Sequence, residues 1–290
     1  MTRRCPMQPS GSYKRQQRTM EWISWIILGL IALVFIYPFL FMVLKSFDET
    51  ANFGLKFPPT LLPVRTGLRN YISSLQMLEI GRFYFNTIYV SVWACILHLG
   101  LGGMAGYALS KGIFRNKHFW LLFILSTMMI PNEAIVLTRF LIFKDFGLVN
   151  TYLGLILPSL AYPFGIFLCK QYFDGIPGFL REAAKIDGAN EFEIFYKIYL
   201  PLAGPIMATL TILTVMSQWN SLMWPLLMLT KPDMYTISLG IAVYAENEMK
   251  QAVIGNSLAI STMAVLPVVI IYLFLQKYII QSIASSGAKG

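Results

Sequence analysis

The residues best placed to do chemistry lie in a polar segment, 174–201, between two long apolar runs. Its landmarks are Glu182-Ala183-Ala184, Gly188 and Leu200-Pro201. The mixture of small apolar and charged side chains over 179–187 predicts a short amphipathic helix. Such a helix can dock into a groove of another protein or lie on a lipid surface. We therefore expect this segment to recognise a partner surface, either a protein groove or lipid.

The acidic side chains of this segment favour a protein groove over lipid. An anionic lipid surface would repel them, and lipid-bound helices favour Lys, Trp and Leu over an Ala-Ala pair. The acids are Glu182, Asp187, Glu191 and Glu193. We therefore expect a protein partner.

Local signals predict that the segment folds as two helices at a bend. Pro177 suits a first helical position, and Gly188 suits the left-handed residue just past a helix end. One face of the first helix is apolar and the other largely charged. The apolar face holds Phe179, Ala183 and Ile186, and the charged face holds Arg181, Glu182, Lys185 and Asp187.

The second helix of the segment has its own start and stop signals. Asn190 can cap it, and Glu193 three residues later completes a capping box. Glu193 can also pair with Lys197 one turn on. Leu200-Pro201 then breaks the helix, and the chain turns into the next apolar run.

Other kinds of chemistry find no support in the sequence. No G-x4-G-K-[ST] loop is present, so this chain cannot itself cradle ATP phosphates. His98 and His118 form no metal-binding pair, and no nucleophile–base arrangement can be recognised. A glycine-rich run at 100–106 is better explained by close helix packing along Gly102, Gly106 and Ser110 than by nucleotide binding. We expect neither an enzyme nor a metal or cofactor site on this chain.

Composition indicates an integral membrane protein. Of the 290 residues, 56% are hydrophobic and 13% are charged, whereas a soluble domain carries about a quarter charged residues. The net charge of +9 comes from basic residues at the ends of apolar runs, where they orient helices and meet anionic lipid. Nucleic-acid binding is not expected, because no recognition motif accompanies the charge.

Six apolar segments are long enough to cross a bilayer of about 30 Å. They lie near 22–44, 86–110, 119–141, 152–173, 200–229 and 258–280. We therefore predict an all-α integral membrane protein with one six-helix domain over 22–283. Tails at 1–21 and 284–290 flank it. Five basic residues precede the first helix, which places both termini in the cytoplasm.

The polar segment also resembles a known family. Its residues match the EAA loop E-A-A-x3-G-x9-I-x-L-P of ATP-binding-cassette (ABC) importer permeases at all seven fixed positions. The run Arg181–Ala189 is similar to the form found in carbohydrate-uptake permeases. Residues 275–290 are similar to the tail of the shorter maltose-importer permease. The chain thus resembles a type I importer permease of the carbohydrate branch.

This resemblance implies a subunit of a larger transporter in a bacterial inner membrane. Its partners would be a second homologous permease, two ATPase subunits that carry ATP and Mg, and an extracytoplasmic solute-binding protein. The loop would couple the permease to the ATPases. The implied coupling residues are Arg181, Glu182, Ala183, Ala184, Asp187, Gly188, Leu200 and Pro201, with Lys289 and Gly290 at the tail.

Polar residues within the apolar runs are candidates for the transport pathway, because such groups usually face protein or a water-filled cavity. Thr214 and Gln218 share a face of the fifth predicted helix, and Trp219 and Asn220 offer an aromatic ring and an amide for a sugar. Threonines in helices also bond back to carbonyls one turn earlier, which is the simpler reading for them. Glu133 follows the helix-bending Pro131 and either lines a polar pocket or lies near the outer surface.

Two alternatives remain open at this point. An importer of the same build could carry glycerol phosphate, a polyol or another solute. A channel or ATP-independent carrier would instead need paired charges within the membrane, and Glu133 is the only acid within an apolar run.

Overall fold

A computed structural model describes residues 11–53, 60–249 and 253–287, and these residues are mainly helical. Beyond short 3-10 and π turns, the helices are α1 (Gly11–Ser46), α2 (Arg69–Met77), α3 (Ile80–Lys111), α4 (Lys117–Thr127), α5 (Asn132–Asp145), α6 (Tyr152–Ile156), α7 (Pro163–Asp174), α8 (Phe179–Ile186), α9 (Glu191–Ile194), α10 (Leu200–Leu202), α11 (Gly204–Trp219), α12 (Met223–Met228), α13 (Ile237–Met249) and α14 (Ile254–Gly287). Within this part of the chain the sole β contact is an isolated bridge between Asp48 and Thr66.

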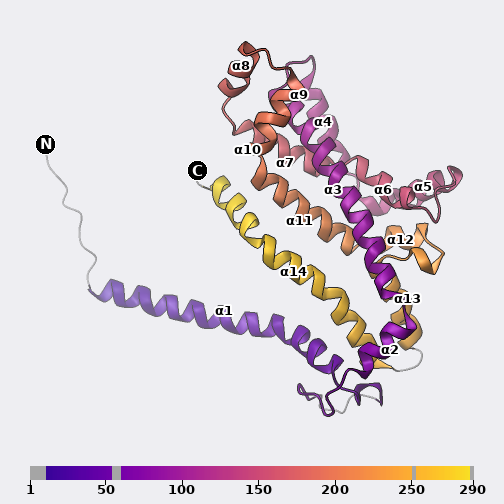
Figure 1. Ribbon diagram of the computed structural model, residues 1–290. Coiled ribbons are helices and arrows are strands. Elements are labelled where there is room, and N and C mark those ends of the chain that lie inside the picture. Colours follow the sequence, from indigo (N-terminus) through magenta and orange to yellow (C-terminus); the bar gives the residue numbers. More distant parts are fainter. Residues whose placement is uncertain (1–10, 54–59, 250–252, 288–290) are drawn as a thin grey trace. The chain divides into compact units, whose positions relative to one another are not determined.

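The described residues form two compact units. Within the described residues, the first draws on 11–53, 60–74 and 253–262, and the second on 75–249 and 263–287. In the second unit, α8 and α9 lie at one end and α12 and α13 at the other (Figure 1). The predicted division into tails and one transmembrane domain over 22–283 stays a prediction.

The described helices include three that are long and apolar enough to cross a membrane singly. These spans are Met20–Ser46, Ile80–Lys111 and Ile254–Phe274. Three bent pairs also meet the requirement, which gives up to six spans when each pair counts as one. This agrees with the six apolar segments predicted from the sequence.

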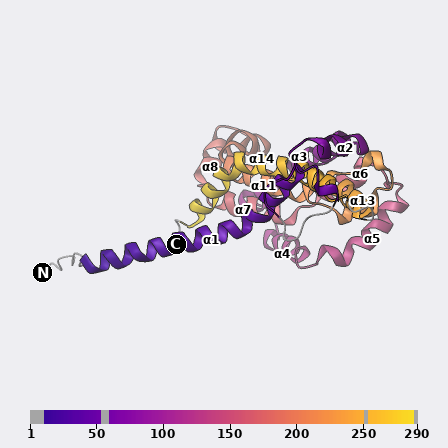
Figure 2. The same ribbon diagram turned by 90° about the horizontal axis from the view of Figure 1, so that it is seen from below.

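The predicted segment 119–141 is not one continuous helix. It is divided into α4 and α5, whose axes meet at 92° (Figure 2). Pro131 lies directly before α5 in an extended conformation, and it has no amide hydrogen to continue the α4 ladder. A bend at Pro131 is confirmed, but it is sharp enough to separate two helices.

The predicted segment 200–229 is also shorter than expected. The helix breaks at Ala203, where α10 and α11 belong to a pair bent by 80°. It ends at Trp219, where the Asn220 amide donates to the Met216 carbonyl, and α12 is a separate helix. Pro205 is the second residue of α11, and it has no amide hydrogen to bond back into α10. A proline therefore lies at each of these two breaks, and the predicted segment 152–173 is likewise a pair of helices, bent by 41°.

The second unit is built on α3, which packs most extensively against α7 and α11. Gly106 permits the contact with α7, because a Cβ atom there would lie 2.5 Å from Cys169 Cβ and 2.9 Å from the Lys170 amide nitrogen. The predicted small-residue contact is therefore confirmed at Gly106. A Cβ at Gly102 would meet only ordinary contacts of 3.9 Å or more.

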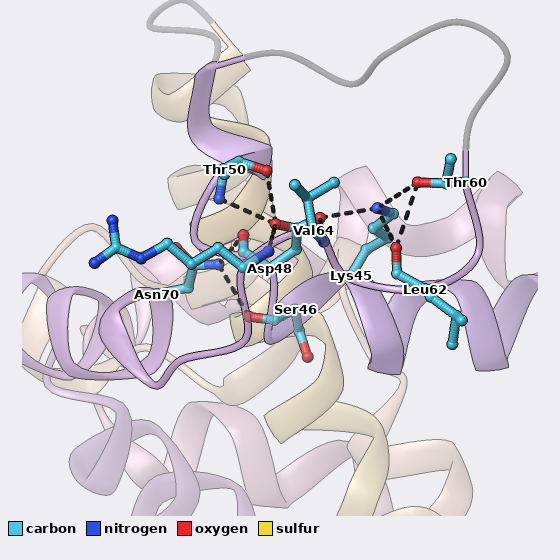
Figure 3. Close-up of polar contacts among 9 residues, drawn as sticks. Lys45, Ser46, Asp48, Thr50, Thr60, Leu62, Val64 and Asn70 are labelled. Atoms are coloured by element: carbon cyan, nitrogen blue, oxygen red, sulfur yellow. Dashed lines mark hydrogen bonds and ion pairs between the residues drawn. The ribbon is translucent and has the colours of Figure 1, made fainter.

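A buried ion pair organises the chain after α1 in the first unit. Lys45 Nζ lies 2.8 Å from Asp48 Oδ2, and the two residues are 3% and 1% exposed. Lys45 also donates to Thr60 Oγ1 at 3.2 Å and to the Leu62 carbonyl at 3.0 Å. The ammonium group is therefore surrounded by three acceptors (Figure 3).

The Asp48 carboxylate is equally well satisfied. It accepts from the amide and hydroxyl of Thr50 and from the amides of Val64 and Arg65. Burial alone would raise the pKa of Asp48, but the hydrogen bonds from Lys45, Thr50 and Val64 outweigh it and hold the pKa well below its usual range. The carboxylate therefore stays charged.

Asn70 completes this cluster. It is fully buried, donates to the carbonyls of Ser46 and Asp48, and accepts from the Asn52 amide. We call the cluster the Asp48 knot. It comprises Lys45, Ser46, Asp48, Thr50, Thr60, Leu62, Val64 and Asn70 (Figure 3).

Candidate functional site

The polar segment 174–201 contains α8 and α9, as the sequence predicts. α8 begins at Phe179 with Gly178 as its N-cap, so Pro177 precedes the helix rather than opening it. Gly188 has φ +82°, which confirms the left-handed turn. Nothing lies within 4 Å of a Cβ built there, so a larger residue would be strained by its backbone alone.

The start of α9 has the predicted capping box. The Glu193 amide donates to Asn190 Oδ1 at 3.0 Å, and the Asn190 amide donates to Glu193 Oε2 at 3.1 Å. Lys197 Nζ lies 3.0 Å from Glu193 Oε1, so the predicted i,i+4 pair is also present. These features depend only on neighbouring residues, which is why sequence reasoning found them.

The apolar row of α8 faces away from the rest of the second unit. Phe179 is 65% exposed and Ile186 87% exposed, and Ala183 between them is also exposed. Ala184 points the other way and joins the buried cluster around Phe173 and Tyr199. The helix is therefore attached by one side and presents its larger apolar side chains on the other.

Arg181 departs from the prediction. It was expected on the charged face of the helix together with Glu182 and Lys185, but it is buried, with 9% exposure. Its guanidinium donates to both carboxylate oxygens of Glu191 at the start of α9, and Lys185 Nζ lies 2.9 Å from Glu191 Oε1. The helical wheel missed this because the carboxylate that draws Arg181 inward belongs to a different helix.

The end of the segment contains a π-helical turn, Phe195–Tyr199. The Leu200 amide bonds to the Phe195 carbonyl, five residues back, and Pro201 follows it without any amide hydrogen. The helix nevertheless continues to Leu202, so the predicted break at Leu200-Pro201 is wrong by two residues. The wide turn accommodates the proline and directs Phe195 and Tyr199 into the core.

The remaining residues of the predicted coupling set divide into two groups. Glu182 and Asp187 are exposed on or just after α8, where a partner can reach them. Lys289 and Gly290 lie outside the described residues. The coupling role of the whole set stays a prediction.

The predicted pathway residues on α11 mostly have partners within the second unit. Thr214 is buried, and its hydroxyl lies 2.9 Å from His98 Nδ1. Gln218 reaches Ser159 Oγ at 3.3 Å, and the buried Trp219 donates to the Ala264 carbonyl at 3.1 Å. Each of these three side chains has a partner, and their pathway role stays a prediction.

The other threonines of α11 follow the simpler reading. Thr209 and Thr211 bond back to the carbonyls of Pro205 and Met207. Asn220 and Glu133 are both exposed, Asn220 at the end of α11 and Glu133 in the first turn of α5. Trp219 borders an apolar groove of about 340 Å³ on α3 and α11, whose lining includes Ile88 and Thr211.

Comparison with known proteins identifies the family. Residues 98–285 match the family described as binding-protein-dependent transport system inner membrane component. The chain belongs to this family. It is 34% identical to the arabinooligosaccharides transport system permease protein AraQ of Halalkalibacterium halodurans, over 95% of this chain and 100% of that protein. It is 30% identical to the diacetylchitobiose uptake system permease protein NgcG of Streptomyces coelicolor, over 90% of this chain and 87% of that protein.

A solved structure agrees with this membership. A bacterial ABC transporter involved in the import of the acidic polysaccharide alginate contains a chain that matches with a TM-score of 0.78 and 28% identity. The match covers 94% of this chain and 99% of that one. The chain is therefore a permease subunit of an ABC importer with the type I fold, as predicted.

The family membership also determines where the protein works and what it works with. The permease is a multi-pass inner-membrane protein that works with other transporter subunits, and ATP hydrolysis belongs to a separate subunit. The alternative of an ATP-independent carrier or channel loses its basis.

Sequence reasoning missed how the polar residues of the permease pair with each other. Tyr107 of α3 donates to Glu191, and His98 stacks on Tyr162 with ring centroids 4.1 Å apart. The indication of these pairings in the sequence was the presence of lone polar residues in apolar helices. Such residues indicate that partners exist but do not identify them.

Proposed function

We propose that this permease imports a sugar or oligosaccharide and is coupled to ATP hydrolysis through the segment 174–201. The observation that carries the coupling role is the outward apolar row of α8, Phe179, Ala183 and Ile186, on a helix whose other side is anchored by Arg181 and Ala184. An exposed apolar face of this kind marks a surface that contacts a partner. The names of the relatives, which concern arabinooligosaccharides, diacetylchitobiose and trehalose/maltose, support the substrate class.

The proposed assembly has four kinds of partner. A second homologous permease completes the pathway, two ATPase subunits carry ATP and Mg, an extracytoplasmic binding protein delivers the solute, and membrane lipid surrounds the helices. Both termini and the segment 174–201 lie in the cytoplasm. The exposed carboxylates of Glu182 and Asp187 beside the apolar row suit an ATPase groove with an apolar floor and basic rim.

The proposed mechanism is alternating access. Closure of the ATPase dimer displaces α8, and its anchored side passes that displacement to the membrane helices. Gly188 holds the turn that directs the chain from α8 into α9. An alanine at its φ of +82° costs about 1–2 kcal/mol.

A second substrate class has a specific observation in its favour. The chain is 28% identical to the sn-glycerol-3-phosphate transport system permease protein UgpE of Agrobacterium fabrum, over 90% of this chain and 94% of that protein. Glycerol phosphate or a polyol is therefore the alternative substrate. Uptake measured with labelled maltooligosaccharides, arabinooligosaccharides and glycerol 3-phosphate separates the two classes.

Affinity purification from the native membrane tests the assembly. The tagged permease should bring down a second permease, a Walker-A-bearing ATPase and a binding protein, identified by mass spectrometry. Recovery of the permease alone in several mild detergents would contradict the proposed assembly.

Two variants test coupling in proteoliposomes. Gly188→Ala and Glu182→Lys should lower solute transported per ATP hydrolysed. Gly178→Ala is the matched control, because Gly178 lies on the same segment with φ −69° and open space around its Cβ position. Wild-type coupling in both test variants would overturn the role of the segment.

A further inference from the structure

One carboxylate in the second unit binds side chains from two other helices. Glu191 Oε2, at the start of α9, accepts from Tyr107 of α3 at 2.8 Å and from Arg181 Nε of α8 at 3.3 Å. Glu191 Oε1 accepts from Arg181 Nη2 and lies 2.9 Å from Lys185 Nζ, also of α8. We call Tyr107, Arg181, Lys185 and Glu191 the Glu191 clasp.

The charged and polar groups of the clasp satisfy one another electrostatically. Tyr107 is 6% exposed and Arg181 9%, whereas the Glu191 side chain is 43% exposed. The hydrogen bond from Arg181 is the largest influence on the carboxyl and, despite partial burial, the pKa of Glu191 is lowered to about 2. Glu191 is therefore ionised throughout the physiological range, and its hydrogen bonds are charge-assisted.

Behind the clasp, Tyr107 is fixed by aromatic packing. Its ring centroid lies 4.9 Å from that of Tyr199, 5.4 Å from Phe195 and 6.1 Å from Phe173. These rings come from the π-helical turn and from α7. Tyr107 therefore connects Glu191 to the packed core of the second unit.

Without the clasp, α8 has a weak hold on that core. It is 8 residues long and ends at the Gly188 turn, and its buried residues are Arg181 and Ala184. Ala184 offers one methyl group. A force applied to Phe179 or Ile186 would then rotate α8 about its ends instead of moving α3.

We propose that the Glu191 clasp is the joint that passes displacement of α8 to α3 and thus to the transport pathway. Glu191 and Tyr107 act as positioning residues for coupling, and neither needs to touch the ATPase. This proposal rests on the proposed coupling function of the segment 174–201.

The neighbouring acid provides a matched control. Glu193 lies two residues from Glu191 and is also paired, but its lysine partner, Lys197, belongs to the same stretch of helix. Its other bonds form the capping box within the same turn. Glu193 therefore joins no separate elements, and its charge is not needed for transmission.

The test uses the complete transporter in proteoliposomes, with ATP hydrolysis and solute uptake measured on the same vesicles. Glu191→Gln keeps the shape of the side chain and removes its charge. We expect Glu191→Gln to lower uptake per ATP by about five-fold or more, with subunit stoichiometry unchanged, whereas Glu193→Gln stays within about two-fold. A purely structural role would lower ATP hydrolysis and uptake together, and that result would overturn the proposal.

Tyr107→Phe provides a second test, because it removes one hydroxyl group and preserves the packed ring. Like Glu191→Gln, it should lower uptake per ATP. The double variant with both Tyr107→Phe and Glu191→Gln should have an uptake per ATP only slightly below that of Glu191→Gln alone. Independent losses that multiply in the double variant would contradict a shared joint.

Measuring Gly188→Ala in the same vesicles distinguishes a failure of the clasp proposal from a failure of the proposed coupling function of the segment 174–201. If Gly188→Ala uncouples the transporter and Glu191→Gln does not, the clasp is wrong and the coupling segment stands. If neither variant uncouples it, the coupling function itself is contradicted.

Discussion

The Asp48 knot and the Glu191 clasp both hold a carboxylate against basic side chains, yet they are built for different tasks. Asp48 is 1% exposed, and its partners come from a single stretch between Lys45 and Arg65. The Glu191 side chain is 43% exposed, and its partners come from two other helices. The first arrangement fixes one loop, and the second joins separate elements.

Their energetics should differ accordingly. Removing one partner of a buried pair leaves an uncompensated charge in a poorly hydrated site, which costs several kcal/mol. A half-exposed carboxylate retains water when a partner is lost, so the cost is smaller. The knot should therefore determine stability, and the clasp should determine how motion is transmitted.

The largest effect is expected at the knot. Asp48→Ala strands the buried Lys45 ammonium and should lower the free energy of unfolding by about 3–5 kcal/mol. Thermal unfolding of the purified transporter in detergent measures this. The pair Arg65–Glu49, at 3.1 Å with the Arg65 side chain 77% exposed, is the control, and Arg65→Ala should cost at most about 1 kcal/mol. Equal shifts in the two variants would contradict the distinction.

A smaller loss is expected at the buried amide of the knot. Asn70→Ala removes two donors to the Ser46 and Asp48 carbonyls and should cost about 1–3 kcal/mol in the same unfolding assay. Asn220→Ala, at an exposed amide that bonds to the Met216 carbonyl, should change stability by about 0.5 kcal/mol or less. A larger loss at Asn220 would reverse the assigned order.

The pH dependence of the clasp follows from the pKa of Glu191, which is lowered to about 2 from its ordinary 4.5. The ionised form stabilises the folded state fully above about pH 4.5, and this contribution fades as the pH falls toward 2. The melting temperatures of wild type and Glu191→Gln should therefore converge on acidification from about pH 6 to about pH 3. Asp48 is present in both proteins, so its own pH dependence cancels in the difference between the two melting temperatures. A difference independent of pH would show that charge is not what the clasp uses.

The smallest effect is expected at the cap of α9. Asn190→Ala removes the oxygen that accepts the Glu193 amide and should cost about 1 kcal/mol, confined to this helix. Faster amide hydrogen exchange over 191–194 is the expected observation. Asn190→Ser keeps a capping oxygen and should restore most of the protection, so a failure of Ser to do so would contradict the capping role.

Features set by neighbouring residues could be predicted from the sequence. The capping box at Asn190, the left-handed Gly188 and the apolar row through Phe179 and Ile186 each depend on a few consecutive positions, and all are present. The number of apolar segments was equally accessible, because bilayer thickness sets the length of each.

Features that depend on distant residues could not be predicted in the same way. The 92° angle at Pro131 depends on packing around the bend, since a proline permits a break without setting its size. The pairing of His98 with Thr214 joins positions on two apolar helices, and spacing along the chain does not reveal it.

The sequence by itself determined the family, the membrane class and the outward row of α8, because motif spacing and hydropathy act locally along the chain. Only the tertiary structure decided that Arg181 lies buried and that Glu191 joins α8, α9 and α3. The physical reason is that a charged side chain enters the interior only where a partner compensates its desolvation. Which partner does so is fixed when α8 packs against the start of α9 and both lie beside α3.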